Sequence, residues 1–338
     1  MTKYTNPLID EYKSKFKAYE ELTTSLHQTI KALMQEERDK KHSIVAIEAR
    51  TKEVESVEEK VTRKGDKYTS LDQITDLSGI RIIACLKEEV DRICDSIKKN
   101  FHIDYENSVD KGGQLNPDQF GYRSIHYVVA YKTDWLKLPL YKRFDGKKAE
   151  VQVRTILEHA WASIDWRLRY KPEFEDLPES MKRHLYRISA LLETADMDFT
   201  SLNNLTLDLS RRYEENIKKG NLEIEVNQDS LEQFLDIFLA KSDTVSELKS
   251  IAKKAKFHIS PPHPRTRNPM LNLSIALHVA GIAHISALKE TLKAARAGAP
   301  AFLGKLYKIW DKNTKERQNR PEMLGIDLGS LIRLLVIE

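Results

Sequence analysis

Two acidic residues are candidate ligands for a metal ion. Asp76 stands just before Gly79-Ile-Arg81-Ile-Ile, where a buried strand is expected to begin, and Glu150 lies in the alternating segment 148–155. A carboxylate at a strand end is well placed to bind a metal, and two of them could share one Mg²⁺ that also binds phosphates. Asp76 could instead simply cap a turn. The metal hypothesis requires both carboxylates to converge from separate strands.

Polar side chains share one face of this alternating segment. If the segment is a strand, one face carries Glu150, Gln152 and Arg154. The opposite face carries Val151 and Val153. The polar face could simply meet solvent, as in many antiparallel sheets. A second carboxylate on it favours a functional face.

Cations recur on one side of a helix that the pattern predicts for residues 44–61. At about 100° per residue, one stripe contains Lys52, Ser56, Lys60 and Arg63. Several cations and a hydroxyl on one stripe suit a polyphosphate, which needs several donors at once. A solvated surface helix with Glu/Lys pairs explains the same pattern, and Arg50 does not fit the stripe.

A loop rich in Gly and Asn leads into the segment 120–126. An aromatic side chain such as Tyr122 can stack on a purine, while Arg123 and His126 can meet phosphate or hydroxyl groups. A tyrosine at the start of a strand more often packs against its neighbours. The segment is therefore a candidate nucleotide contact, with plain packing as the alternative.

The elements that must position these residues change in type along the chain. Strands are expected at 79–86, 102–109, 124–132, 139–144 and 148–155, with Asp145-Gly146 as a hairpin turn between the last two. Helices are expected at 6–35, 44–61, 88–99, 156–170, 178–218, 230–239, 245–255, 271–297 and 301–313. The fold class is therefore α+β, with a mixed central β-sheet flanked by helices and a mainly helical C-terminal domain.

A domain boundary is expected near residue 220. The sequence Lys218-Lys-Gly220-Asn places a glycine where a helix C-cap commonly lies. The 338 residues have room for two domains, which we place at 1–219 and 220–338.

The composition is that of an ordinary globular protein, with 41% apolar residues, 31% charged residues and a formal net charge of +4. Cys85 and Cys94 are the only cysteines, and they do not form a CxxC pair. The N-terminus has no apolar leader, and no apolar run is long enough to span a bilayer. We expect a cytoplasmic protein with no membrane association, no structural zinc and no disulfides.

The order of the motifs resembles one family. Arg50-x-Lys52-x3-Ser56-x3-Lys60 is followed by DLSGIRI, then GYRSIH, then EVQVRT with LEHAWASID. This succession is similar to the RelA/SpoT alarmone synthetase domain over roughly residues 40–171. The chain lacks the His-Asp signature of the family's hydrolase domain and shows no TGS-type module, so it looks like a small synthetase-only member. The resemblance implies a nucleotidyltransferase-like synthetase fold that transfers the β,γ-diphosphate of ATP to a 3′-hydroxyl.

The resemblance also implies a role for each motif residue. Arg50 and Arg81 would sandwich the adenine. The ATP phosphates would be bound by Lys52, Ser56 and Lys60. Asp76 and Glu150 would ligate Mg²⁺, with Glu150 also the base for the 3′-hydroxyl. The implied acceptor-binding residues are Tyr122, stacked on the base, and Arg123, His126, Gln152 and Arg154.

The acceptor remains open between GDP or GTP and the 3′-CCA end of tRNA. Family members that make guanosine alarmones commonly have a Lys-containing PK sequence before GYRS, whereas this chain has Pro117-Asp118-Gln119-Phe120. The first hypothesis is synthesis of ppGpp or pppGpp. The aspartate weakens binding of 5′-phosphates and so also fits the toxic branch of the family, which modifies tRNA. The basic patches Lys253-Lys254-Lys256 and Arg265-Arg267 could bind tRNA phosphates or simply be solvated. A third reading is an inactive nucleotide sensor, which would not need both Asp76 and Glu150.

The region from residue 220 onward resembles no family that we can name. Its candidate roles are regulation or neutralisation of the synthetase, binding of a regulatory partner, and assembly into a homo-oligomer.

Overall fold

The computed structural model describes residues 6–38, 44–64, 67–110, 124–169, 178–241, 250–259, 268–314 and 324–326. The chain divides into two compact units, Met1–Leu202 and Asn203–Glu338. This division falls inside helix α7 (Glu179–Lys218), before the boundary expected from the sequence. The domain limits 1–219 and 220–338 therefore stay a prediction.

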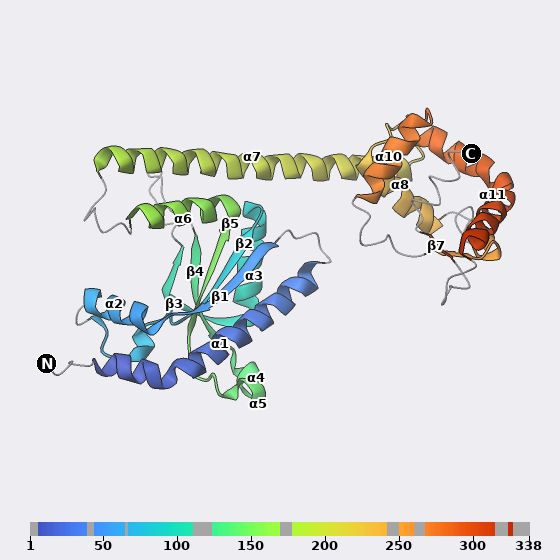
Figure 1. The fold of residues 1–338 in the computed structure, drawn as a ribbon. Coiled ribbons are helices and arrows are strands. Elements are labelled where there is room, and N and C mark those ends of the chain that lie inside the picture. The colour runs from blue at the N-terminus through green and yellow to red at the C-terminus, as the bar shows by residue number, and fades with distance from the viewer. Residues whose placement is uncertain are drawn as a thin grey trace. The chain divides into compact units, whose positions relative to one another are not determined.

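The first unit is built on a five-stranded sheet with the order β1-β2-β5-β4-β3 (Figure 1). Its strands are β1 (Ile44–Thr51), β2 (Ser78–Ala84), β3 (Phe101–Asp110), β4 (Ile125–Tyr131) and β5 (Ala149–Thr155). β2 and β5 are parallel, and every other neighbouring pair is antiparallel. The sheet is mixed, which confirms the expected α+β class.

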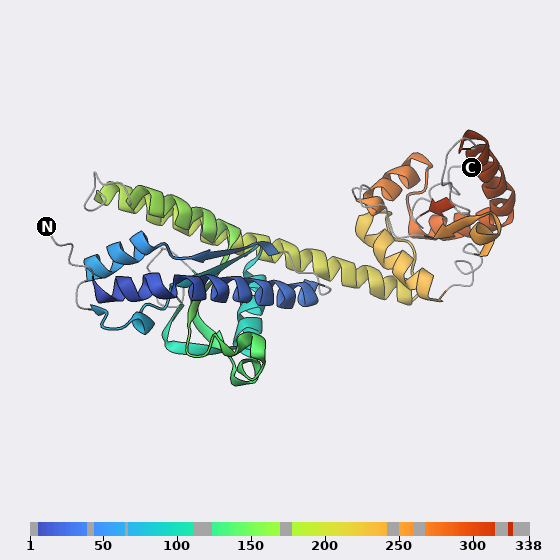
Figure 2. The same ribbon diagram turned by 60° about the horizontal axis from the view of Figure 1, so that its bottom comes forward.

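The same unit contains several helices, some of which contact the sheet strands directly. They are α1 (Pro7–Arg38), α2 (Val54–Lys64), α3 (Lys87–Asn100), α4 (Thr133–Leu136), α5 (Pro139–Lys142), α6 (Ile156–Arg169) and the first part of α7, with a 3₁₀ turn at Leu71–Gln73. One face of the sheet is apolar, and Ile80 and Val151 there join Leu26 of α1 and Val90 of α3 in a single core. Figure 2 shows α1 lying alongside the sheet. Because α1 and α3 fill this face, the alternating polar residues lie on the other one.

The prediction of a helix over 44–61 is wrong in its first half. Residues 44–51 form the edge strand β1, which pairs with β2 from Ile44 opposite Ala84 to Thr51 opposite Ser78. The apolar spacing of this segment resembles a helical pattern because an edge strand at this position is only partly buried. Ladder hydrogen bonds to β2 then override the local pattern.

The prediction of a strand at 139–144 is also wrong, because this segment contains α5. Pro139 occupies the first turn of that helix, where its fixed φ and missing N–H fit well. Gly146 does adopt a positive φ of 70°, but the turn joins α5 to β5 rather than two paired strands. The remaining strands and helices expected in this unit are confirmed, with small shifts at their ends.

The second unit is mainly helical, as expected. It contains the end of α7, α8 (Gln228–Lys241), α10 (Pro269–Val279), α11 (Ile285–Thr314) and the short parallel strands β6 (Phe257–Ile259) and β7 (Leu324–Ile326). Gly220, with φ of 82°, ends α7 as a C-cap, as predicted. The helix expected over 271–297 is wrong, because Gly281 at φ 77° separates α10 from α11. The break expected near residue 300 is absent, since α11 continues through Pro300 with Ala299 and Leu303 buried beside it.

Within the described residues, no helix is both long enough and apolar enough to cross a membrane.

Candidate active site

Asp76 and Glu150 lie at the starts of two neighbouring parallel strands. Asp76 precedes β2 by two residues, and Glu150 is the second residue of β5. The register pairs Gly79 with Glu150, so both carboxylates belong to the same edge of the sheet. They are close enough for the negative charge of Asp76 to act on Glu150. This placement supports the metal hypothesis, which stays a prediction.

Two lysines bind the Asp76 carboxylate. Lys52 Nζ donates to Oδ2, and Lys60 Nζ donates to Oδ1 at 2.7 Å. Burial raises the pKa of Asp76, but the charges and hydrogen bonds of the two lysines outweigh burial and leave the pKa below its ordinary value. Burial lowers the pKa of Lys52, and repulsion from Lys60 and Arg50 lowers it further, although Asp76 opposes this change. Positive charge therefore exceeds negative charge here, which suits a polyanion.

The lysines come from different elements, which corrects the single stripe expected on one helix. Lys52 lies between β1 and α2, and its backbone N–H donates to the carbonyl oxygen of Leu77 at 2.8 Å. Lys60 lies on α2 itself, one turn after the exposed Ser56. Arg63 is exposed farther along α2. Lys52 and Lys60 lie close together because both bind the carboxylate of Asp76.

Arg50 and Arg81 lie on the polar face of neighbouring strands. The register places Arg50 opposite Gly79, and a carbon added to Gly79 would meet the Arg50 Cγ at 3.8 Å. Arg81 Nη1 donates to Glu48 Oε2 at 3.0 Å, and its Nε donates to Gln152 Oε1 at 3.4 Å. The misfit of Arg50 with a helical stripe is thus explained, because Arg50 belongs to β1.

Glu150 is held by hydrogen bonds to both of its oxygens. His126 Nδ1 lies 2.8 Å from Oε1, and Gln152 Nε2 donates to Oε2 at 2.8 Å. The other His126 ring nitrogen contacts the hydroxyl of the buried Ser124. Burial raises the pKa of Glu150, but His126 and Gln152 outweigh burial and leave the pKa below its ordinary value. At neutral pH the carboxylate is therefore ionised and fixed in orientation.

Arg154 is buried near the far end of β5, where it pairs with Ile83. His159 of α6 lies near the same charges. Burial lowers the pKa of His159, and the positive charges of Arg154 and Arg81 lower it further. Its Nδ1 is buried with no hydrogen-bond partner among the residues that the structure describes. His159 is therefore a neutral side chain beside the polar face.

Comparison with known proteins matches this part of the chain to one family. Residues 49–175 fit the sequence pattern described as a region found in RelA / SpoT proteins. The chain is 30% identical to the GTP pyrophosphokinase YjbM of Bacillus subtilis (strain 168) over 192 residues, which is 55% of this chain and 83% of that protein. The chain belongs to the RelA/SpoT family.

A second relative supports this assignment, and two solved structures also match part of the chain. The GTP pyrophosphokinase YwaC of the same organism is 28% identical over 151 residues, 44% of this RelA/SpoT chain and 68% of YwaC. The small alarmone synthetase 1 of Bacillus subtilis matches with a TM-score of 0.49 at 24% identity, covering 59% of this chain and 99% of its own. A GTP pyrophosphokinase family protein from Streptococcus pneumoniae matches with a TM-score of 0.48 at 25% identity, covering 59% and 96%. This RelA/SpoT chain is an enzyme of the pyrophosphotransferase class.

Two residues of the RelA/SpoT motifs were not predicted as site residues, and two predicted ones lie outside the residues that the structure describes. Tyr122 and Arg123 lie outside the described residues. Ser124 and His159 were not predicted as site residues, although both fall within the motifs GYRSIH and LEHAWASID that carry the resemblance. Glu48 had no sequence signal, because its segment was expected to be helical.

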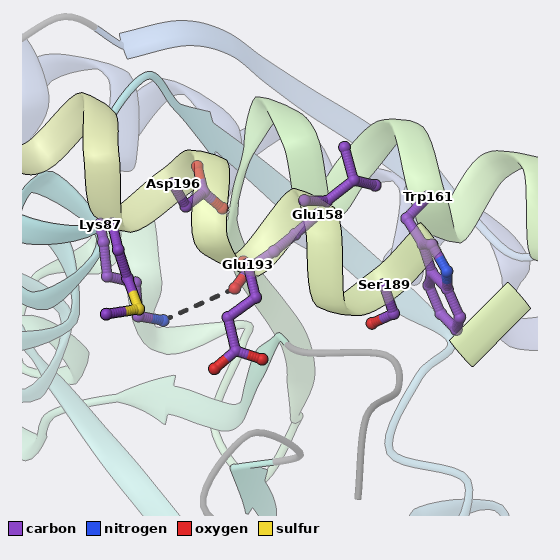
Figure 3. Close-up of a pocket in the computed structure, with 8 residues that line it drawn as sticks. Lys87, Glu158, Trp161, Ser189, Glu193 and Asp196 are labelled. Atoms are coloured by element: carbon purple, nitrogen blue, oxygen red, sulfur yellow. Dashed lines mark ion pairs between the residues drawn. The ribbon is translucent and has the colours of Figure 1, made fainter. Parts of the chain in front are cut away.

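A separate cavity of about 70 Å³ lies in the same unit of this RelA/SpoT chain (Figure 3). It is lined by Lys87, Glu158, Trp161, Ser189, Leu192, Glu193, Asp196 and Met197. Asp196 is 7% exposed and accepts a hydrogen bond from Thr155 Oγ1 at 2.7 Å. The cavity is too small for a nucleotide, and it contains none of the predicted site residues.

Proposed function

We propose that the enzyme transfers the β,γ-diphosphate of ATP to the 3′-hydroxyl of GDP or GTP, which makes ppGpp or pppGpp. One observation carries the proposal: an aspartate bound by two lysines lies beside an oriented, ionised glutamate at the starts of paired parallel strands. Two curated relatives that are named GTP pyrophosphokinases support the guanosine acceptor.

The cationic residues form the ATP side. Lys52 and Lys60, with Ser56 on the same helix as Lys60, would bind the phosphate oxygens. Arg50 and Arg81 are spaced across neighbouring strands and would flank the adenine. Fixed cations lower the barrier to diphosphate transfer because charge spreads over the phosphate oxygens in the transition state.

The two carboxylates fit Mg²⁺. This ion is usually bound by one or two carboxylates plus substrate phosphates and water, rather than by a full cage of protein ligands. Asp76 and Glu150 supply that number, and the ion would neutralise charge on the transferred group. To bind a metal, Asp76 would release the ammonium groups of Lys52 and Lys60, which would then be available to phosphate oxygens.

Glu150 is the proposed base on the acceptor side. It would accept the proton of the 3′-hydroxyl while that oxygen forms a bond to the β-phosphorus. The bond from the β-phosphorus to the oxygen of the α-phosphate breaks, and AMP leaves. His126 and Gln152 orient Glu150 through the two contacts of 2.8 Å, so the base needs no rearrangement before it acts.

The 3′ end of tRNA is the second candidate acceptor. The sequence Pro117-Asp118-Gln119-Phe120 has an aspartate where a phosphate-binding lysine is expected, which favours an acceptor without 5′-phosphates at this point. The exposed Lys253 and Lys254 belong to a short basic cluster in the second unit. Such a cluster fits the phosphates of a nucleic acid.

The test is incubation of the full chain and Mg²⁺ with ATP labelled at the γ-phosphate, in separate reactions with GDP, GTP and deacylated tRNA. We expect label in GDP or GTP. Label in tRNA alone would replace the first acceptor with the second. No labelled acceptor in any reaction would contradict both candidates. The Glu150→Gln variant is the matched control in each reaction, since it keeps the size of the side chain and removes the base.

A further inference from the structure

The buried hydroxyl of Tyr12 contacts the backbone of Lys52, one of the proposed ATP-binding residues. Tyr12 of α1 has 0% of its surface exposed. Its O–H donates to the carbonyl oxygen of Lys52, which is far away in sequence. The N–H of Lys52 donates to the carbonyl of Leu77, next to Asp76. The backbone of Lys52 is therefore fixed on both sides.

Further polar contacts join α1 to the same strand ends. Thr51, the last residue of β1, donates its hydroxyl to Thr23 Oγ1 at 2.9 Å. Ser78, the first residue of β2, donates its hydroxyl to the carbonyl of Tyr19 at 3.1 Å. A buried polar group that loses its partner costs more than the hydrogen bond contributes. These contacts therefore fix α1 against the points where the ATP-side residues leave the sheet.

We infer that Tyr12 is a positioning residue for the ATP side of the site, an inference that rests on the proposed function. By binding the Lys52 carbonyl, its hydroxyl fixes the junction between β1 and α2, and so the direction from which Lys52 reaches the phosphates. Burial raises the pKa of Tyr12, and nearby negative charges that include Asp76 raise it further. The hydroxyl thus stays protonated and able to donate at neutral pH.

Tyr12→Phe tests this inference because it removes a single oxygen. Tyr19→Phe is the matched control. Tyr19 is also buried on α1, with its ring 5.7 Å from that of Tyr12, and its hydroxyl has no hydrogen-bond partner in the part of the chain that the structure describes.

The probe is α,β-methylene ATP, in which carbon replaces the oxygen of the bond that transfer breaks. We expect the affinity of the full chain for this probe to fall about three- to tenfold in Tyr12→Phe. It should not change in Tyr19→Phe.

Two further measurements separate positioning from general loss of structure. In turnover assays the KM for ATP should rise in Tyr12→Phe, while the KM for the nucleotide acceptor stays constant. In a Lys52→Ala background, Tyr12→Phe should add less than about a twofold loss, because the side chain that it positions is gone. Equal affinity of Tyr12→Phe and wild type, or equal losses in both tyrosine variants, would overturn the inference and leave the proposed function intact. A wild-type protein that binds no probe would overturn both.

Discussion

The two faces of the central sheet differ in the side chains that the same strands place on them. On β2 and β5, the buried Ile80, Ile82, Val151 and Val153 point into the core. Their alternating neighbours, Arg81, Glu150 and Gln152, lie on the opposite face. They form hydrogen bonds with one another and with Glu48 and His126. Because the side chains of a strand alternate, a shift of one residue would exchange the two sets.

The residues that stabilise the fold and the residues proposed for chemistry therefore lie on different faces of the sheet. The apolar face is covered by α1 and α3 and supplies hydrophobic stabilisation. The polar face contains carboxylates and cations whose mutual contacts are open to exchange with a substrate. Substitutions on the apolar face should therefore lower stability with little direct effect on chemistry, and those on the polar face should do the reverse.

The largest effect is expected for Glu150→Gln. Loss of the proposed base should reduce kcat by roughly 10²- to 10⁴-fold. Thermal unfolding should change far less than turnover, because an amide of the same size can still contact Gln152, although the stability linked to the lowered pKa of Glu150 is lost. Turnover of ATP with the preferred acceptor measures the first quantity, and calorimetry the second. Glu106→Gln, at an exposed position of β3, is the control. Near-normal turnover in Glu150→Gln would remove Glu150 from the mechanism.

On the apolar face, Ile82→Ala should lower the free energy of unfolding by about 2–5 kcal/mol. Ile82 is 0% exposed, so the cavity cannot be filled by solvent without further cost. Chemical denaturation measures the change, and kcat at a temperature where the variant is folded should stay within a few-fold of wild type. A variant of normal stability that has lost turnover would break the separation between the faces.

Lys60→Ala should raise the KM for ATP by roughly 10- to 100-fold, the range for a lost hydrogen bond to a charged group. Lys64→Ala is the matched control, because Lys64 is exposed in the last turn of the same helix and its loss changes the net charge equally. The two variants are compared by initial rates at several ATP concentrations. If Lys64→Ala raises the KM as much as Lys60→Ala, net charge rather than a direct contact of Lys60 with the ATP phosphates explains the effect.

The smallest effect concerns the pH dependence of stability at the two ends of β5. Burial raises the pKa of Asp196, and the hydrogen bond from Thr155 only partly offsets burial. A raised pKa in the folded state means that the contribution of this group is complete in acid and is lost as pH rises through the folded pKa. Asp196→Asn should therefore be more stable than wild type at neutral pH, and this advantage should shrink towards pH 4.

Asp76 should show the opposite sign. Its lowered pKa adds stability above the pKa of the unfolded chain, and this stability is lost as pH falls. Denaturation of Asp76→Asn and Asp196→Asn across the same pH series tests both signs. Parallel curves for the two variants would contradict the assignment.

Much of the secondary structure of the first unit can be predicted from the spacing of apolar residues in the sequence. Four strands and the long helices have a clear period of two or of about 3.6 residues, and the structure confirms them. The errors have different causes, since β1 depends on its ladder with β2, whereas α5 begins at Pro139, which fits the first turn of a helix. An edge strand takes its identity from the ladder with β2, and burial along Ile44–Thr51 does not alternate clearly enough to mark a strand.

The polar face was predictable as a set of residues, but its geometry was not. Alternation in β5 placed Glu150, Gln152 and Arg154 on one side, and the motif order suggested a partner in Asp76. The approach of Asp76 to Glu150 depends on the parallel pairing of β2 with β5, which brings two strand starts together across a long sequence separation. His159 was missed because a single histidine on a helix has no period to mark it.

The parallel pairing of β2 with β5 also limits how such an enzyme can diversify. Inserting one residue at the start of β5 would turn the proposed base, Glu150, towards the apolar core and a valine towards the polar face. Lineages that adopt a new acceptor are therefore expected to conserve the lengths of these strands and to change the connections between strands instead. Asp118, which stands where a phosphate-binding lysine is expected, is one such position, because in sequence it lies between β3 and β4.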